Sequence, residues 1–222
     1  MRVALIESRP EYITGKNLLP LREILAQSGG KRLEVGIGLE TLSDRIREDA
    51  LRKGFGLAEF EKAVNVLSQY DVDLVVYVML KPTIMEDEEA IAECIRTAQY
   101  VFDVADTMHV RVRVALQPTF VVSGTQLAVD YLNGGYYPPT MEMACRAAWR
   151  ISQLGEVHIG LWDEGLQPIA VPLACAACRP LFVSAISEFN CTQDPAILRQ
   201  SLRRCGDCLV QDRYGRGALP IS

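Results

Sequence analysis

The sequence lacks several features that would place it in a specialised class of protein. No stretch approaches the roughly 18 consecutive apolar residues that a transmembrane helix needs. The first residues carry one arginine and a short apolar run that ends at Glu7, which is not the pattern of a secretory signal peptide. Internal repeats and low-complexity segments are absent as well. These absences predict a soluble, cytoplasmic protein with no membrane partner, in which cysteines stay reduced, bind metal or act in catalysis.

The sequence also contains fewer basic residues than acidic ones. The 222 residues contain 23 lysines and arginines against 28 acidic residues. The resulting net charge of −5 gives no general support for nucleic-acid binding, although it leaves room for a local basic groove. Apolar residues make up 49% of the chain and charged residues 23%, which is the balance of an ordinary globular protein. The length allows one domain, with or without a small appendage.

Five strand-like runs alternate with helical patterns along the chain. The runs cover residues 3–7, 33–39, 72–80, 108–116 and 156–162. The first and third are almost continuously apolar, as parallel strands covered on both faces are. Because strands and helices alternate through short connections, we expect an α/β fold with a parallel sheet and right-handed crossovers.

Two helical patterns between the strands are well marked. Residues 57–67 carry an apolar stripe at helical spacing. Residues 86–102 begin with four acidic side chains, which the dipole of a helix favours at its N-terminus, so we interpret this run as a helix start and not as a metal site. Cys94 lies on the apolar face of this helix, and Cys145 on that of a later one. Both are predicted to be core residues.

Polar residues follow each strand-like run. They are Glu7 with Arg9, Glu40, Lys81, Gln117, and Asp163 beside Trp162. In a parallel barrel, functional side chains gather at the carboxyl ends of the strands. Gly36 and Gly38 share a strand face with Glu40, and glycines inside a strand mark the close approach of a ligand or of another part of the chain. These strand ends are therefore the candidate site.

The fourth strand-like run alternates strictly between two faces. One face is apolar and the other carries His109, Arg111 and Arg113. If the apolar face packs on helices, the two arginines line the interior and require anionic partners or ligands. The alternative is that they coat an exposed edge. His109 and His158, each within a predicted strand, are interpreted as structural residues.

Several stretches resemble a known family. ESRPEYIT, LEVGIGLETLSDRIREDALRKGF and VVYVMLKPTIMEDEEAI are similar to successive strand–loop–helix units of radical S-adenosylmethionine (SAM) enzymes. The most similar group contains the radical SAM subunit of archaeosine synthase, and the Elongator catalytic subunit is more distant. LQPTFVVSGTQLAVDYLNGGYYPP and CAACRPLFVSAISEFNCTQD resemble later stretches of that group. The resemblance implies part of a (β/α) barrel, of about five strands, and SAM-dependent radical chemistry on a tRNA or nucleoside substrate.

The resemblance also implies roles for the strand ends. The positions that would face SAM are Glu7, Ser8, Arg9, Glu40, Leu80, Lys81 and Pro82. Those that would border the substrate are Lys53, Gln117, Gly124 and Thr125, to which the barrel-interior interpretation adds Arg111 and Arg113. No residue is assigned as catalytic.

The cluster-binding motif of radical SAM enzymes is not in the sequence. That chemistry needs three thiolates in a CxxxCxxC loop that holds a [4Fe–4S] cluster, and none of the seven cysteines shows this spacing. Because the family places the loop after its first barrel strand, we expect this chain to match the C-terminal portion only. A cluster-bearing N-terminal half is then the expected partner for SAM cleavage. The alternatives are a cluster-less relative that binds a nucleotide or SAM-like ligand, and a zinc-stabilised interaction module.

The alternation of strand-like and helical patterns stops after residue 164. We divide the chain into a partial barrel over residues 1–164 and a Cys-rich tail over residues 165–222. The tail starts with a proline-containing coil and continues with two short helices near residues 181–189 and 196–203. It also carries two CxxC pairs.

The cysteine pairs of the tail suggest a metal site. They are Cys175 with Cys178 and Cys205 with Cys208. Four thiolates suit tetrahedral Zn²⁺, and 26 residues separate the pairs. This gap is longer than the usual ~15–20 residues, so an iron–sulfur cluster and free thiols remain open.

The first strand-like run would form the edge of the sheet. An open edge must be covered, and we expect a partner half, a homodimer or the tail to cover it.

Overall fold

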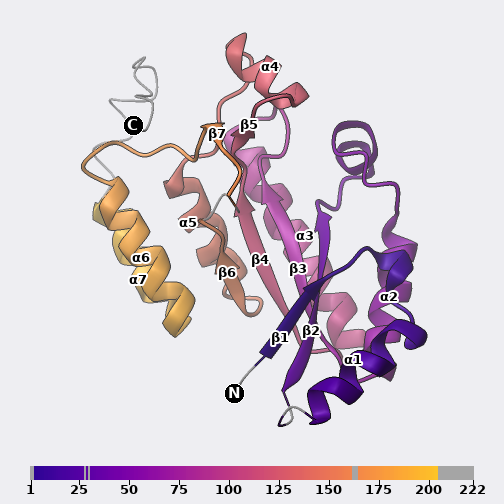
Figure 1. Cartoon of the computed structure of the whole chain (residues 1–222). Helices are drawn as coiled ribbons and strands as arrows, with labels where there is room; N and C mark the ends of the chain where they lie inside the picture. The colour runs from indigo at the N-terminus through magenta and orange to yellow at the C-terminus, as the bar shows by residue number, and fades with distance from the viewer. Residues whose placement is uncertain (1–2, 28, 30, 162–164, 205–222) are drawn as a thin grey trace.

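The computed structural model describes residues 3–27, 29, 31–161 and 165–204. Five strands form one parallel sheet in the order in which they occur in the chain (Figure 1). They are β1 (Val3–Glu7), β2 (Arg32–Glu40), β3 (Asp73–Leu80), β4 (Val112–Pro118) and β6 (Val157–Ile159). The helices that connect them are α1 (Gly15–Gln27), α2 (Leu57–Gln69), α3 (Asp87–Thr107) and α5 (Met141–Ile151). The α/β fold with a parallel sheet, predicted from the sequence, is confirmed.

The strand order decides which kind of parallel sheet this is. When neighbouring strands follow one another in the chain and the crossovers are right-handed, the connecting helices all fall on one face of the sheet. That is the arrangement of an arc of a β/α barrel, whose opposite face is the barrel interior. We call this opposite face the concave face.

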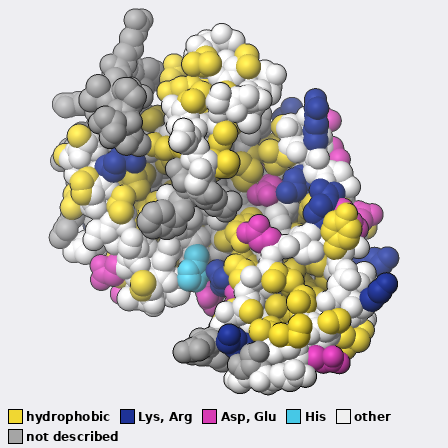
Figure 2. All heavy atoms as spheres, viewed as in Figure 1, with side chains coloured by type: hydrophobic (Ala, Val, Ile, Leu, Met, Phe, Trp, Pro, Cys, Tyr) yellow, Lys and Arg dark blue, Asp and Glu magenta, His cyan; other side chains and the backbone are white. Residues whose placement is uncertain are grey.

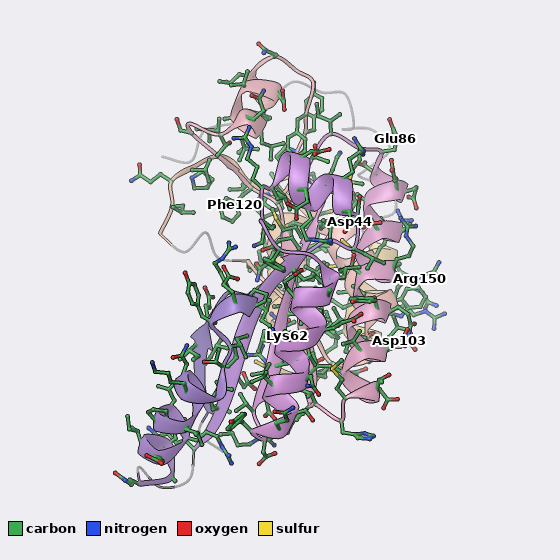
Figure 3. All side chains as sticks on the ribbon, turned by 90° about the vertical axis from the view of Figure 1, so that its right-hand side faces the viewer. Asp44, Lys62, Glu86, Asp103, Phe120 and Arg150 are labelled. Carbon is green, nitrogen blue, oxygen red and sulfur yellow. The ribbon has the colours of Figure 1, made fainter. Side chains whose placement is uncertain are left out.

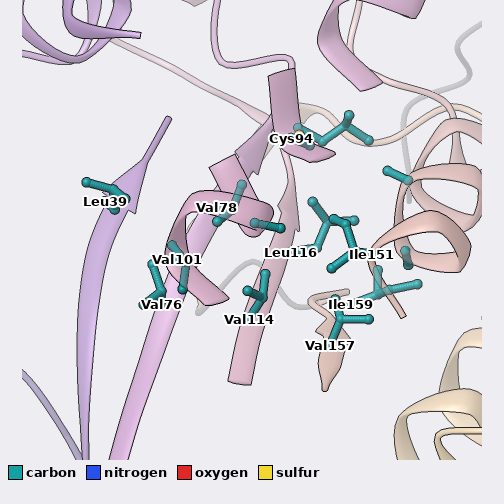
Figure 4. Close-up of a cluster of buried hydrophobic side chains, with 14 of the residues drawn as sticks. Leu39, Val76, Val78, Cys94, Val101, Val114, Leu116, Ile151, Val157 and Ile159 are labelled. Carbon is teal, nitrogen blue, oxygen red and sulfur yellow. The ribbon is translucent and has the colours of Figure 1, made fainter. Parts of the chain in front are cut away.

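The core lies between the sheet and its helices. Every second residue of each strand points to the helices, and Figure 4 shows Val76, Val78, Val114 and Leu116 in this layer. The labelled side chains of Figure 4 are 2% exposed or less. The predicted core positions of Cys94 and Cys145 are confirmed, at 1% and 0% exposure.

The outer surface of helices α2, α3 and α5 carries exposed charged side chains. Lys62 on α2, Asp103 on α3 and Arg150 on α5 are exposed side chains of this surface (Figure 3). The helix predicted from the four acidic residues begins at Asp87, as expected from the helix dipole. None of the helices in the described parts of the chain combines the length and apolarity that a bilayer span requires.

The fourth strand starts later than the alternating pattern predicted. A strand was expected from residue 108, but α3 continues to Thr107 and is closed by a turn. In this turn His109 has a φ of +56°, and the Val110 N–H donates to the Ala105 carbonyl at 2.9 Å. The placement of His109 within a strand was therefore wrong, because the end of a helix produced an alternation that resembled a strand.

The segment after residue 164 is more ordered than the sequence suggested. A coil was expected, but β7 (Pro168–Ala170) pairs antiparallel with β5 (Val121–Val122). No local pattern indicated this strand, because the segment is rich in proline and its partner strand lies far away in the sequence. The two predicted helices are confirmed as α6 (Arg179–Thr192) and α7 (Pro195–Arg204).

Helix α6 closes one edge of the sheet. Its side chains Phe182, Ile186 and Phe189 are buried in the same core as β6. The Asn190 side chain accepts a hydrogen bond from the Ile159 N–H and donates one to the Ile159 carbonyl, both at 2.9 Å. Asn190 thus satisfies the backbone of β6 as a neighbouring strand would, and this protects an edge that would otherwise be open.

A small flap lies beyond the carboxyl end of β4 (Figure 1). It consists of residues 119–140 and 165–173, and it contains β5, β7 and α4 (Gln126–Leu132). Val121, Ala128, Tyr136 and Ala170 form its own hydrophobic core. The flap therefore packs as a separate layer at the rim of the sheet.

Candidate functional site

Polar side chains meet on the concave face at the carboxyl ends of β1, β2 and β3. The Tyr77 hydroxyl donates to Glu7 Oε1 at 2.7 Å, and Lys53 Nζ donates to Glu40 Oε1 at 3.0 Å. Arg9 lies in the loop that follows β1 and donates to the Lys53 carbonyl at 2.9 Å. We call Glu7, Arg9, Glu40, Lys53 and Tyr77 the strand-end cluster. Three strands and two loops thus bring five polar groups together.

Two glycines of β2 make room for this cluster. A Cβ atom at Gly36 would lie 2.9 Å from Cε2 of Tyr77. A Cβ atom at Gly38 would lie 2.3 Å from Oε1 of Glu40 and 2.9 Å from Nζ of Lys53. The close approach that the sequence suggested at these glycines is therefore made by side chains of the site itself.

Two strand ends hold a strained backbone. Glu40 has a φ of +68° and Lys81 a φ of +61°, and the pairing of β2 with β3 shifts register between Gly38 and Glu40. A non-glycine residue in the left-handed region costs about 1–3 kcal/mol and persists where the surrounding structure holds it. Such outliers concentrate at functional sites, and both residues were predicted from the sequence as site positions.

The carboxyl group of Glu40 has a shifted pKa. Burial raises the pKa of Glu40 above its usual value, the Lys53 ammonium opposes this rise, and the nearby Glu7 carboxylate adds to it. The Glu40 side chain is 15% exposed and that of Lys53 24%. Two carboxylates thus share this corner with one ammonium, and the protonated form of Glu40 is favoured relative to a free glutamate.

Two cationic side chains and an aromatic ring lie beside the carboxylates. The Arg9 guanidinium carbon lies 5.7 Å from the centre of the Phe55 ring, and Lys53 Nζ lies 5.8 Å from it. Phe55 is buried, so its ring supports both cations from the protein side. The site therefore offers negative groups from the strands and positive groups from the loops.

Lys81 is directed away from the concave face. Its ammonium donates to Asp87 Oδ1 at 2.6 Å in the first turn of α3 and lies 5.8 Å from the centre of the Tyr136 ring. The Tyr136 hydroxyl donates to the Lys81 carbonyl at 2.8 Å. Lys81 thus connects the end of β3 to α3 and to the flap. The neighbouring Leu80 and Pro82 side chains are buried, so only their backbone could face a ligand.

The residues predicted on the substrate side are spread over three places. Lys53 belongs to the strand-end cluster. Gln117 is the penultimate residue of β4 and lies over Gly160, where the Gln117 side-chain amide fills the position of a Cβ atom. Gly124 and Thr125 lie on the flap, where Thr125 Oγ1 accepts a hydrogen bond from the Ala128 N–H at 3.1 Å and caps α4.

The two arginines lie toward the amino ends of the strands. Arg113 is the second residue of β4, and its guanidinium donates to Glu34 Oε2 at 2.8 Å on the concave face. Arg111 precedes the strand and pairs with Glu156 at 3.8 Å. Arg113 is 24% exposed and has the anionic partner expected for an interior arginine, whereas Arg111 is 61% exposed, as the alternative of an exposed edge expected. Neither arginine contacts the strand-end cluster in the contacts described above.

Sequence reasoning missed two residues of the site. Tyr77 lies within an apolar run and Phe55 within a loop motif, so neither was singled out as a site residue. The signal for Tyr77 was available, since it is a polar-tipped residue opposite a glycine on the same face of neighbouring strands. No local pattern distinguishes Phe55.

The predicted zinc ligands are only half described. Cys175 and Cys178 lie at the start of α6, where the Cys178 N–H donates to Cys175 Sγ at 3.3 Å. Cys205 and Cys208 lie outside the described residues. In the described ranges, no group of three or more His, Cys, Asp or Glu residues could hold a metal ion, so the structure does not support the zinc site.

The chain resembles curated proteins over nearly its whole length. It is 29% identical over 203 residues, 90% of its length, to archaeosine synthase subunit beta of Methanosarcina acetivorans. The chain is homologous to archaeosine synthase subunit beta. The protein of the same name from Thermococcus kodakarensis is 24% identical over 204 residues. The resemblance that the sequence stretches suggested is therefore confirmed, although no protein-family model matches the chain.

The match covers only part of each relative. The aligned region takes in 56% of the Methanosarcina protein and 60% of the Thermococcus protein, so the chain spans little more than half of their length. Among solved structures, the archaeal Elp3 of Methanocaldococcus infernus with an N-terminal deletion is similar, with a TM-score of 0.57. The likeness covers 83% of this chain and 41% of that one at 17% identity, and it bears on the fold alone.

Proposed function

We propose that the chain is the C-terminal part of a radical SAM enzyme that modifies tRNA or a nucleoside. Homology to archaeosine synthase subunit beta supports the enzyme class. The observation that carries the proposal is the strand-end cluster, which lies where parallel barrels place their ligands. The relatives are longer, and we assign the missing cluster-bearing half to the part of them that this chain does not match. Such an enzyme would act in the cytoplasm.

The strand-end cluster has the chemistry to hold SAM. The Glu7 and Glu40 carboxylates can accept hydrogen bonds from an α-ammonium group and from ribose hydroxyls. Lys53 and Arg9 can bind an α-carboxylate. SAM, when bound and reductively cleaved, supplies the radical that removes hydrogen from the substrate. The residues of this chain bind and orient it: Tyr77 fixes the Glu7 carboxylate, and Lys53 fixes that of Glu40.

The described cysteines do not fit a [4Fe–4S] cluster. Cys94 and Cys145 are enclosed in the helical core, and Cys94 Sγ donates to the Met79 carbonyl at 3.1 Å. Cys175 and Cys178 lie at the start of α6. The proposal therefore places the cluster on the partner half.

Calorimetric titration of the purified chain with SAM tests the site. We expect Glu7→Gln and Lys53→Met each to weaken binding by about tenfold or more, because each removes a charged hydrogen-bonding group. Glu34→Gln is the matched control, since Glu34 lies on the same face but nearer the amino end of β2, where it pairs with Arg113. Equal binding by all four proteins contradicts the assignment of the cluster. A chain that binds no SAM with or without the cluster-bearing half contradicts the proposal.

The coding DNA around this chain tests whether a cluster-bearing partner half exists. The coding sequence before Met1, or an adjacent gene, should contain a CxxxCxxC segment. Within the described residues β1 pairs with β2 alone, and its Val3 and Leu5 side chains are 45% and 43% exposed. We propose that the partner half continues the sheet at this edge. Absence of any such segment would contradict the partner half and favour the alternative, a cluster-less relative that binds a ligand.

Structural Zn²⁺ in the tail remains part of the proposal. Cys175 and Cys178 are close in the structure, and the spacing of Cys205 and Cys208 supplies a second pair in the sequence. Metal analysis of Cys178→Ser tests it. An unchanged zinc content in this variant, or wild-type protein without zinc, contradicts the site.

A further inference from the structure

The loop between β2 and α2 carries part of the strand-end cluster. It covers residues 41–56, begins directly after Glu40 and contains Lys53 and Phe55. Figure 2 shows acidic and basic side chains next to one another at the carboxyl ends of β1 and β2, where this loop begins. A lysine ammonium sits on a flexible stem, so its position depends on how firmly the main chain beneath it is held. The contacts that hold this loop therefore decide whether Lys53 reaches Glu40.

One arginine of this loop lies inside the protein. The Arg47 side chain is 1% exposed, whereas Arg45, two positions earlier, is exposed. Arginines are almost never fully buried unless their charge is paired and their donors are satisfied. The burial of Arg47 therefore depends on specific partners.

The guanidinium of Arg47 joins the two ends of the loop. Its Nη1 donates to the Thr41 carbonyl at 3.0 Å and to the Leu42 carbonyl at 3.4 Å, at the start of the loop. Its Nε donates to the Phe55 carbonyl at 3.2 Å, near the end of the loop. Its Nη2 pairs with the exposed Asp44 carboxylate. Because the donors of a guanidinium lie in one rigid plane, these contacts fix the two ends of the loop relative to each other.

The main chain of Arg47 holds the residue that carries the ammonium. The Lys53 N–H donates to the Arg47 carbonyl at 3.0 Å. Arg47 itself belongs to a π-helical turn, Ile46–Ala50, a rare geometry that frequently occurs at functional sites. Arg52 and Gly54, on either side of Lys53, have φ values of +51° and +66°. Lys53 thus lies in a tight bend, and Arg47 ties this bend to the end of β2.

We propose that Arg47 is a positioning residue of the strand-end cluster, which sets the Lys53 ammonium against the Glu40 carboxylate by clamping the two ends of the loop. Its own guanidinium is enclosed and acts through the loop. The hold on Lys53 is a property of the free chain. Its consequence for SAM binding rests on the proposed function.

Chemical labelling of the lysines in the full chain tests this hold without a ligand. Acetic anhydride modifies the neutral form of an amine, and an ion pair favours the charged form. We expect Arg47→Met to raise the labelling rate of Lys53, measured by mass spectrometry, by about threefold, the factor expected when a partly exposed ion pair is released. The rate of Lys81, which is 10% exposed and paired with Asp87, should stay unchanged.

Two further variants complete the labelling experiment. Arg45→Met is the matched control, because it removes an exposed arginine from the same loop, and it should change neither rate. Arg47→Lys keeps the charge but not the planar fork, so it should raise the labelling rate of Lys53 as well. Circular dichroism establishes that each variant is folded, and Arg47→Lys provides the result if Arg47→Met does not fold.

Titration with SAM measures the consequence for binding. Arg47→Met should weaken binding by about tenfold, as Lys53→Met does. In the Lys53→Met background its effect should be much smaller, because substitutions that act through one shared contact are not additive.

The outcomes separate this proposal from the proposed function. An unchanged labelling rate of Lys53 in the folded Arg47 variants overturns the role of Arg47. An equal rise at Lys53 and Lys81 overturns it too, since it shows a general loosening of the fold, and so does full additivity in SAM binding. If even the wild-type chain with its cluster-bearing half binds no SAM, the proposed function fails, and the labelling rates still decide whether Arg47 positions Lys53.

Discussion

Tyr77 on β3 reaches across β2 to donate a hydrogen bond to Glu7 on β1, at 2.7 Å. Its ring lies over Gly36, the residue of β2 that separates the two strands at this level. The contact joins three strands at their carboxyl ends and fixes the carboxylate that we propose as a ligand of SAM. A residue with any side chain at the middle position would disturb it.

Gly36→Ala is expected to destabilise the protein by about 1–3 kcal/mol, the usual cost of overpacking a filled site. The new methyl group would lie 2.9 Å from the Tyr77 ring, which must then move away from Glu7. The free energy of unfolding in urea measures the effect, and SAM binding should weaken in parallel. Gly135→Ala is the control, because a methyl group there meets its nearest atom, the Asp130 carbonyl oxygen, at 3.5 Å. Equal stability of the two variants contradicts the prediction.

Glu40 should make the protein less stable as pH rises. Its pKa in the folded state lies above the ordinary value of 4.5, mainly through burial, so the folded protein binds more protons than the unfolded chain above that pH. The free energy of unfolding therefore falls as pH rises from 4.5 through the folded pKa. In Glu40→Gln this part of the pH dependence should disappear. Urea unfolding at a series of pH values measures it, and an unchanged slope in the variant speaks against the raised pKa.

Glu93 should have the opposite effect. Burial disfavours its charge, but hydrogen bonds from the Thr41 hydroxyl at 2.6 Å, from Arg96 at 2.7 Å and from the Ser43 N–H at 3.0 Å outweigh this and lower its pKa. Its stabilising contribution is therefore complete above the ordinary value of 4.5 and is lost as pH falls through the lowered folded pKa.

Glu93→Gln consequently should cost about 1–3 kcal/mol at neutral pH, and the difference from wild type should vanish in acid. The same urea titrations provide the measurement. Glu89→Gln, an exposed position on the same helix, controls for the loss of one negative charge. A difference that persists undiminished at acid pH would rule out a charge-dependent role.

Asn190→Ala should expose the edge of β6. The substitution removes both hydrogen bonds to Ile159 and leaves a backbone N–H and carbonyl without these partners, at a cost of about 1–3 kcal/mol. Thermal unfolding monitored by circular dichroism and light scattering should show a lower midpoint and earlier aggregation, since an open edge pairs with other chains. Thr192→Ala, an exposed position on the same helix, should change neither. Identical behaviour of the two variants would show that the edge is protected by other means.

The sequence by itself predicted most of the local structure. The apolar runs, the acidic start of α3 and the stripe of α2 predicted elements that the structure contains, because strand and helix periodicity depend on residues a few positions apart. It also pointed to Glu7 and Glu40, because polar residues at the ends of apolar strands fall on one rim of a parallel sheet. Lys53 was indicated only by the family resemblance. The start of β4 was misplaced because the left-handed turn at His109 has no periodic signal.

Tertiary structure alone decided which of these residues meet. Tyr77 and Glu7 are 70 positions apart, and Asn190 and Ile159 are 31 apart. The pairing of β5 with β7 and the pairing of Arg113 with Glu34 were likewise not readable from the sequence. Contacts across a parallel sheet depend on strand order and register, and these follow from how all the helices and strands pack together. A single-sequence pattern therefore identifies the strand ends, and only packing determines the site that they form.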